Sequence, residues 1–180
     1  MFFKEVGLKG AYIIEPEKFE DERGFFTRVW DREIFHSVGL NTNLIQCNIS
    51  FNKLKGTLRG LHFQVKPYEE AKVVRCTKGS VFEVLIDIRK NSKTFKKWIS
   101  VNLSAENYKL LYVPEGFALG FQTLEDNSEL FYQMSQVYKP EYAKGIRWDD
   151  KTFNIPWPEM VSVISERDKS FPEFNESVVM

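Results

Sequence analysis

The sequence predicts an all-β fold, a jelly-roll β-barrel with a few short helices, and three observations carry this prediction. The chain has 180 residues, the length of one ordinary domain, so residues 1–180 are taken as a single domain. Its middle part consists of short alternating runs separated by turn residues, which is typical of sandwiches and barrels. Aromatic residues make up 15% of the chain, and this favours a β-rich core or an aromatic-lined pocket.

The expected strands follow one another along the chain. Two runs within residues 70–90 flank the turn signal Lys78-Gly79, and a break at residues 125–127 separates two more within 117–138. Further strands are expected at residues 11–14, 24–30, 58–65, 96–104 and 107–116, which gives about ten strands. A helix is expected near residues 30–39, and one or two short helices in the tail, residues 148–172.

Charge and composition exclude several classes of protein. The 25 Lys and Arg residues balance 25 Asp and Glu residues, which argues against a nucleic-acid binder that depends on phosphate attraction. No apolar run approaches the roughly 20 residues that a membrane helix needs, and acids interrupt the N-terminal segment, so no signal peptide is expected. We expect a cytoplasmic protein with no membrane partner, in which Cys47 and Cys76 are buried and unpaired.

The chain has two histidines, His36 and His62. In a helix near residues 30–39, His36 points away from the apolar face of Trp30, Ile34 and Val38 and is expected at the surface. A metal site requires several converging histidines and carboxylates, so none is expected.

Strand alternation gives candidate functional residues. Side chains two positions apart share a face, so His62, Lys72 and Tyr132 each alternate with residues of a potential barrel interior. Each has an ordinary alternative: a core or surface histidine, a solvated lysine, a core tyrosine. From residue types alone, the sequence predicts a β-barrel with a possible polar pocket.

Nine ordered blocks extend this interpretation. They are DERGFF (21–26), QCNIS (46–50), KGTLRGLHFQ (55–64), AKVVRCTKGSVFEVLIDIR (71–89), VPEGFALGF (113–121), LFYQMSQVYKPEY (130–142), GIRWDD (145–150), IPWP (155–158) and SERDK (165–169). Together they resemble the dTDP-4-dehydrorhamnose 3,5-epimerase family over nearly the whole chain. The resemblance implies a cupin-type jelly roll that works as a homodimer with exchanged N-terminal strands and needs no cofactor or metal. It also implies epimerisation at C3 and C5 of a nucleotide-diphospho-4-keto sugar, by proton transfer next to the ketone.

The resemblance implies a role for particular residues. His62 would be the general base, Asp168 its hydrogen-bonding partner, Tyr132 the general acid, and Lys72 the cation near the ketone oxygen. The matching substrate-binding positions are Arg23, Gln46, Asn48, Arg59 and Lys169, with Arg59 at the diphosphate.

Three positions depart from the family pattern. Leu119 stands where the family carries a histidine, Arg28 where it carries a glutamate, and Cys47 where an acid is frequent. We count Leu119 and Arg28 among the substrate-binding residues and predict a changed substrate, because an Arg fork suits the O6 and N7 edge of guanine. The leading hypothesis is therefore a GDP-linked 4-keto-hexose or heptose of surface (capsule) polysaccharide synthesis, as in the GDP-4-keto-heptose 3,5-epimerase branch.

Other functions stay open. The alternatives are the dTDP-4-dehydro-6-deoxyglucose 3,5-epimerase of rhamnose biosynthesis and a non-catalytic sugar-nucleotide-binding cupin. A metal-dependent oxygenase or isomerase on the same barrel is a further rival, but it would need several barrel histidines. The sequence leaves open whether C3, C5 or both carbons are inverted.

Overall fold

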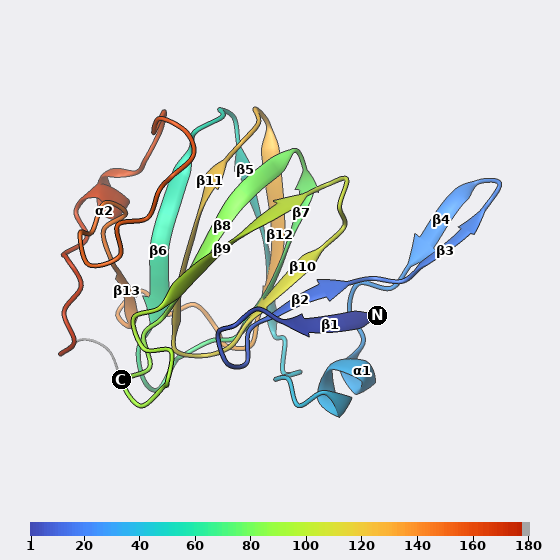
Figure 1. Cartoon of the computed structure of the whole chain (residues 1–180), viewed down its shortest axis with the longest axis horizontal. Helices are drawn as coiled ribbons and strands as arrows, with labels where there is room; N and C mark the ends of the chain where they lie inside the picture. The colour runs from blue at the N-terminus through green and yellow to red at the C-terminus, as the bar shows by residue number, and fades with distance from the viewer. Residues whose placement is uncertain (178–180) are drawn as a thin grey trace.

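The computed structural model describes residues 1–177, and the all-β prediction is confirmed (Figure 1). These residues form thirteen strands and two short helices, α1 (Arg32–Ser37) and α2 (Glu166–Lys169). The strands are β1 (Phe2–Glu5), β2 (Tyr12–Glu15), β3 (Lys18–Asp21), β4 (Gly24–Thr27), β5 (Gln46–Asn52), β6 (Leu58–Gln64), β7 (Lys72–Lys78), β8 (Ser80–Asp87), β9 (Trp98–Ser104), β10 (Leu110–Val113), β11 (Phe117–Thr123), β12 (Ser128–Met134) and β13 (Ala143–Gly145). The short strands β1, β3 and β13 and the longer β5 are additions to the predicted set.

Two antiparallel sheets face each other and form the jelly roll. One sheet has the order β1-β2-β10-β7-β12-β5 and the other β13-β6-β11-β8-β9. The core between them takes alternate residues from both sheets, among them Val74 and Leu130 of the first and Leu85 and Leu119 of the second. Burial of these apolar faces, at about 25 cal/mol per Å², holds the two sheets together.

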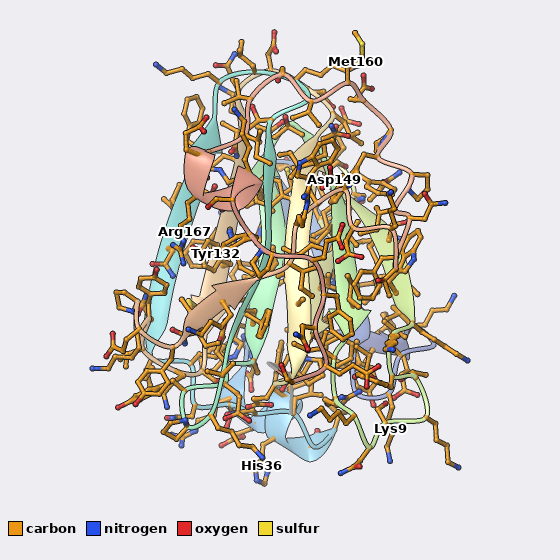
Figure 2. The ribbon with its side chains drawn as sticks, turned by 90° about the vertical axis from the view of Figure 1, so that its left-hand side faces the viewer. Lys9, His36, Tyr132, Asp149, Met160 and Arg167 are labelled. Carbon is orange, nitrogen blue, oxygen red and sulfur yellow. The ribbon has the colours of Figure 1, made fainter. Side chains whose placement is uncertain are left out.

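The outer faces of the sheets are covered differently. Tail residues Phe153 and Trp157 pack on the outside of the five-stranded sheet against Leu61 and Phe63. On the other sheet, α1 buries Phe35 against the outer faces of β2 and β10. Asp31 caps α1 by accepting hydrogen bonds from two backbone N–H groups of its first turn. His36 is exposed on this helix, as predicted (Figure 2).

The hairpin of β3 and β4 extends away from the sheets (Figure 1). It carries the exposed Phe19 and Phe26, whose side chains are 58% and 65% exposed. A hairpin with this much uncovered apolar surface is typical of a segment that packs against another molecule.

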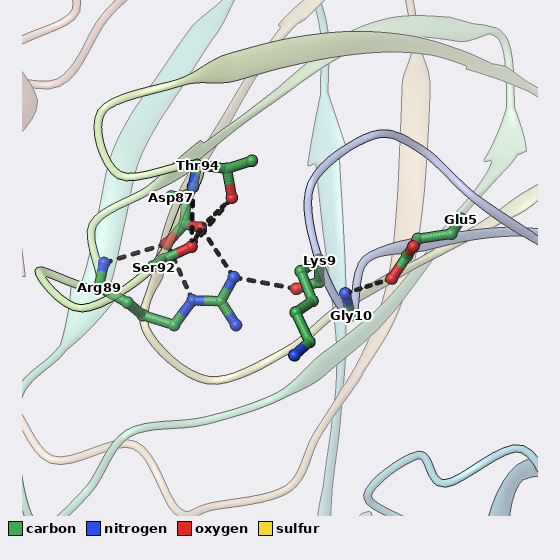
Figure 3. A network of polar contacts seen from close by, with 7 residues as sticks. All are labelled: Glu5, Lys9, Gly10, Asp87, Arg89, Ser92 and Thr94. Carbon is green, nitrogen blue, oxygen red and sulfur yellow. Dashed lines mark hydrogen bonds and ion pairs between the residues drawn. The ribbon is translucent and has the colours of Figure 1, made fainter.

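The end of β8 is fixed by the fully buried Asp87 (Figure 3). Its carboxylate accepts hydrogen bonds from Arg89, Ser92 and Thr94, and Arg89 also donates to the backbone oxygen of Lys9 at 2.9 Å. Burial by itself raises the pKa of Asp87, but these hydrogen bonds outweigh it and hold the pKa below its ordinary value. The network ties the loop after β8 to the loop between β1 and β2.

The two cysteines differ. Cys76 is buried, and burial raises the pKa of its thiol to about 11. Cys47 is exposed, so the prediction that both are buried is wrong for Cys47, because it lies on the uncovered outer face of β5. Both thiols are free. Within residues 1–177, no helix is long and apolar enough to cross a membrane.

Candidate active site

A cavity of about 270 Å³ opens between the two sheets. Its polar lining consists mainly of Arg59, His62, Glu70, Lys72, Glu83 and Tyr132, and its apolar lining includes Val74, Leu119, Phe121, Leu130 and Met134. Tyr132 and Arg167, both labelled in Figure 2, line it as well. The structure therefore brings together His62, Lys72 and Tyr132, the three residues that strand alternation had placed on interior faces.

His62 and Tyr132 reach the cavity from opposite walls. His62 lies on β6 of the five-stranded sheet, and Tyr132 lies on β12 of the six-stranded sheet, opposite Val74 of β7. A planar group held between them has one face toward an imidazole and the other toward a phenol. This is the arrangement that proton removal from one face and return to the other requires.

Asp168 holds the imidazole of His62. Its Oδ1 lies 2.8 Å from Nε2 of His62, and its Oδ2 accepts a hydrogen bond from the backbone N–H of Gly60 at 2.9 Å. Burial by itself raises the pKa of Asp168, but the hydrogen bond and charge of His62 and the Gly60 N–H outweigh it, so the pKa lies below its ordinary value. An ionised Asp168 places the proton of a neutral His62 on Nε2 and leaves the lone pair on Nδ1.

The short helix α2 positions this carboxylate. Ser165 is its N-cap, and its side chain accepts a hydrogen bond from the backbone N–H of Asp168. Phe171 follows the helix and packs edge-on against the His62 ring, with the ring centroids 5.6 Å apart. A side chain at Gly145 would collide with Phe171, so this glycine leaves the space for the ring.

Arg59 shares the cavity with His62 because strand pairing is irregular here. Strict alternation places residues 59 and 62 on opposite faces, but the register between β6 and β11 shifts between the pairs His62↔Leu119 and Arg59↔Phe121. Gly60 has a positive φ, and a Cβ on it would lie 2.7 Å from the backbone of Gly120. The close approach of these two glycines therefore permits the irregularity.

Lys72 lies near two carboxyl groups, Glu70 and Glu83, which were not among the residues predicted from the sequence. Its Nζ is 2.7 Å from Oε1 of Glu70, and both side chains are largely buried. Glu83 is 1% exposed, and burial raises its pKa to about 8, an effect that the charge of Lys72 partly offsets. A sequence signal for Glu83 existed, because it alternates with Val81 and Leu85 on the interior face of β8.

Of the other predicted binding residues, three lie in or beside the cavity and three lie outside it. Leu119 lines the cavity directly opposite His62 in the strand pairing. Gln46 and Asn48 lie on β5 beside the cavity. The Asn48 amide contacts the sulfur of Met134 at 3.5 Å, and Gln46 Oε1 accepts a hydrogen bond from the backbone N–H of Tyr138. They support the cavity wall and do not line it.

Arg23, Arg28 and Lys169 lie outside the cavity of this chain. Arg23, on the turn of the exposed hairpin, pairs with Asp21, and Arg28 pairs with Asp31. Lys169 pairs with Glu166 on α2. Because successive residues of a helix point in different directions, Arg167 lines the cavity instead and donates a hydrogen bond to the Tyr138 hydroxyl at 3.0 Å.

No group of three or more His, Cys, Asp or Glu side chains within residues 1–177 is arranged to hold a metal ion. The cavity lining supplies an imidazole, a phenol, an ammonium group and carboxyl groups. These groups suit proton transfer at a carbon made acidic by a neighbouring carbonyl.

Comparison with known proteins places this chain in a family. The sequence model of dTDP-4-dehydrorhamnose 3,5-epimerase matches residues 5–176. The enzyme of that name from Shigella flexneri is 46% identical over 168 residues, 93% of this chain and 92% of the relative. The crystal structure of dTDP-4-dehydrorhamnose 3,5-epimerase from Bacillus anthracis str. Ames, with TDP and PPi bound, is 36% identical and superposes with a TM-score of 0.93, covering 96% of this chain and 99% of that one.

A second solved structure carries a sugar nucleotide. The dTDP-6-deoxy-D-glucose-3,5-epimerase from Legionella pneumophila Philadelphia 1, in complex with dTDP-4-keto-L-rhamnose, is 33% identical with a TM-score of 0.91, covering 99% of this chain and 96% of that one. These similarities confirm the cupin-type jelly roll, and they favour the dTDP-sugar alternative over the GDP-heptose hypothesis. The chain belongs to the dTDP-4-dehydrorhamnose 3,5-epimerase family and is an isomerase.

Proposed function

We propose that the protein is a 3,5-epimerase of a dTDP-linked 4-keto-6-deoxy sugar, the substrate class of rhamnose biosynthesis. The observation that carries the proposal is the placement of His62 and Tyr132 on opposite walls of one cavity, with Lys72 in the same cavity. The names of the relatives support the nucleotide and the 4-keto-6-deoxy sugar.

The chemistry follows from these groups. Nδ1 of His62 removes the proton from a carbon next to the ketone, and the ionised Asp168 stabilises the imidazolium that forms. The electron pair of the C–H bond moves to the ketone oxygen, where the ammonium of Lys72 stabilises the enolate. Tyr132 then returns a proton to the same carbon from the opposite face, which inverts its configuration.

The mouth of the cavity suits the nucleotide part of the substrate. Arg59, Lys144 and Arg167 add positive charge to the lining, and a guanidinium fork matches the oxygens of a diphosphate. Tyr138 is 43% exposed and offers a flat surface on which a base can stack. We assign the diphosphate to Arg59 and Arg167 and the base to Tyr138.

The apolar wall beside the general base, His62, favours a deoxy sugar. Leu119 pairs with His62 across the strands, and Ala143 lines the same cavity. An apolar wall gains free energy by covering a methyl group, at about 0.8 kcal/mol per buried carbon, whereas it leaves a hydroxyl unpaired. The C6 methyl of a 6-deoxy sugar therefore fits better here than the hydroxylated arm of a heptose.

We also propose that the enzyme works as a homodimer. On the outer face of β5, Ile49 and Phe51 are 65% and 45% exposed, and the hairpin of β3 and β4 adds Phe19 and Phe26. A second copy packed on this face would cover both apolar surfaces. Its hairpin, with Arg23 on the turn and Arg28 directly after β4, would then lie toward the cavity of the first chain, where both arginines could bind substrate as the sequence predicts.

Nucleotide preference tests the proposed substrate. In calorimetric titrations, dTDP should bind at least tenfold more tightly than GDP, and R59A and R167A should each weaken dTDP binding. K93A, a change of a lysine outside the cavity lining, serves as the control. Tighter binding of GDP, or equal binding of both nucleotides, would refute the dTDP assignment.

A further inference from the structure

Lys72 lies close to two buried carboxyl groups that differ in their surroundings. Glu70 forms an ion pair with Lys72 at 2.7 Å, with side chains that are 4% and 14% exposed. Glu83 forms no ion pair or hydrogen bond through its side chain with any residue between 1 and 177. Its Oε2 is buried without a partner, as is Oε2 of Glu70, so the two carboxyl groups differ in the ion pair that Glu70 alone makes. Both carboxyl groups and the ammonium line the same cavity.

The surroundings of Glu83 favour the neutral acid. Its neighbours in alternation, Val81 and Leu85, are fully buried core residues, so the side chain projects from an apolar face. An ionised carboxylate without donors in such a place is costly, whereas a protonated carboxyl carries no charge to desolvate. The raised pKa of Glu83, about 8, agrees with this geometry.

We propose that Glu70 is the counter-ion that positions Lys72, and that Glu83 is a neutral carboxylic acid. In the reaction of the proposed function, on which this inference rests, Glu83 donates a hydrogen bond to the ketone oxygen as the enolate forms. Glu83 is then a second donor beside Lys72, and Glu70 acts through the lysine it holds.

This division of roles keeps the local charge low. With Glu70 ionised, Lys72 charged and Glu83 neutral, the three groups sum to zero before the reaction. When His62 removes the carbon-bound proton, the electron pair goes to the ketone oxygen, and the hydrogen bonds from Lys72 and Glu83 strengthen as the negative charge grows. Glu83 keeps its own proton throughout, because Tyr132 supplies the proton that returns to carbon.

The proposal predicts a loss of activity in alkaline solution. Once Glu83 ionises near pH 8, it loses its donor and adds a negative charge beside the oxygen that must become an enolate. The charged and titratable groups that line the cavity with Glu83 are Lys72 on β7, Glu70 before it, His62 and Arg59 on β6, Tyr132 on β12, Tyr138 after it, Lys144 on β13 and Arg167 on α2. The E83Q substitution removes the titration of this one group and keeps a hydrogen-bond donor in its place.

The two carboxyl groups are separated by matched variants. An amide still donates a hydrogen bond and stays neutral, so E83Q should keep kcat for deuterium exchange within about tenfold of wild type and lose the fall in activity near pH 8. E70Q removes the counter-ion and should lower kcat at least tenfold more than E83Q, with little change in KM. E106Q, at an exposed position outside the cavity, is the control. A loss in E83Q as large as in E70Q, or an unchanged alkaline fall, would overturn the proposal.

Infrared difference spectroscopy tests the protonation state without substrate. The wild-type enzyme at pH 6.5 should show the C=O band of a neutral carboxylic acid that is absent in E83Q and disappears on titration through pH 8. Absence of this band would refute the role of Glu83. Such a failure is distinguishable from failure of the proposed function, because wild-type exchange on a dTDP-4-keto sugar is measured independently.

Discussion

Asp168 fixes His62 twice, once through the ring and once through the strand that carries it. Oδ1 of Asp168 lies 2.8 Å from Nε2 of His62, 106 residues away in the chain, and Oδ2 accepts the N–H of Gly60 two positions before the histidine. One carboxylate therefore sets the tautomer of the ring and the position of its backbone. General-base catalysis needs both, because the lone pair must point at the carbon-bound proton.

Replacing Asp168 with asparagine should lower kcat strongly while leaving dTDP binding nearly unchanged. The amide no longer stabilises the imidazolium and favours the wrong tautomer, an effect on the order of 10⁴ in kcat. Steady-state kinetics and calorimetry check this, with D149N on an outer loop as the control. Wild-type kcat in D168N would show that the dyad has no catalytic role.

The carboxylate of Asp168 also makes the stability of the folded protein depend on pH. The pKa of Asp168 is lowered in the folded protein, so its contribution is complete above the ordinary carboxyl pKa and is lost as the pH falls through the lowered value. Denaturant unfolding between pH 3 and pH 6 should show a smaller loss of stability in D168N than in wild type. An identical pH dependence in the two proteins would contradict the assigned pKa shift.

Glu83 should make the free energy of unfolding depend on pH in the opposite direction. Its pKa is raised to about 8, so between roughly pH 4.5 and pH 8 the unfolded chain releases a proton that the folded chain keeps. Wild-type stability should fall relative to E83Q across this window, by up to about 1.4 kcal/mol per pH unit. Urea unfolding of both proteins at pH 5, 6.5 and 8 measures the difference; a constant difference would argue against a neutral Glu83.

Y132F should separate the two halves of the reaction. Without the phenol, the opposite face receives no proton, so inversion should fall by about 10²- to 10⁴-fold. His62 still removes and returns a proton on its own face, so deuterium from the solvent should enter the substrate with retained configuration. Nuclear magnetic resonance of the sugar distinguishes the two outcomes, and inversion at the wild-type rate would exclude Tyr132 as the acid.

Disrupting the outer face of β5 should produce monomers. Wild-type protein should sediment as a dimer, and I49D, which places a charge at a residue 65% exposed in the single chain, should sediment as a monomer with weaker dTDP binding. M160D is a matched control, because Met160 is 92% exposed on the tail. Monomeric wild-type protein with full activity would refute the dimer proposal.

Strand alternation predicted the interior of the barrel well. Lys72, Val74 and Cys76 share one face of β7, and Leu130, Tyr132 and Met134 share one face of β12, as the sequence indicated. Such predictions succeed because burial imposes a period of two on every strand, whichever strands later become neighbours.

Other parts of the site depend on contacts that alternation does not encode. The register shift near Gly60 brings Arg59 to the side of His62, and the four-residue helix α2 turns Arg167 inward and Lys169 outward. The GDP hypothesis rested on Arg28, whose guanidinium fork suits guanine, and Leu119 was taken to accommodate a different sugar substituent. In the structure Arg28 lies outside the cavity of its own chain and pairs with Asp31. In the structure Leu119 contributes to an apolar wall beside His62, which is compatible with a dTDP-linked deoxy sugar.

Deuterium wash-in distinguishes epimerisation of a dTDP sugar from epimerisation of a GDP sugar in one experiment. The enzyme is incubated in heavy water with dTDP-4-keto-6-deoxyglucose and, separately, with GDP-linked 4-keto-hexose and heptose, and the mass of each sugar nucleotide is followed with wild type and H62N. With wild type the dTDP sugar should gain two deuteriums, and with H62N it should gain none. Exchange confined to a GDP sugar, or no exchange on any of the three, would refute the proposed dTDP-sugar 3,5-epimerase.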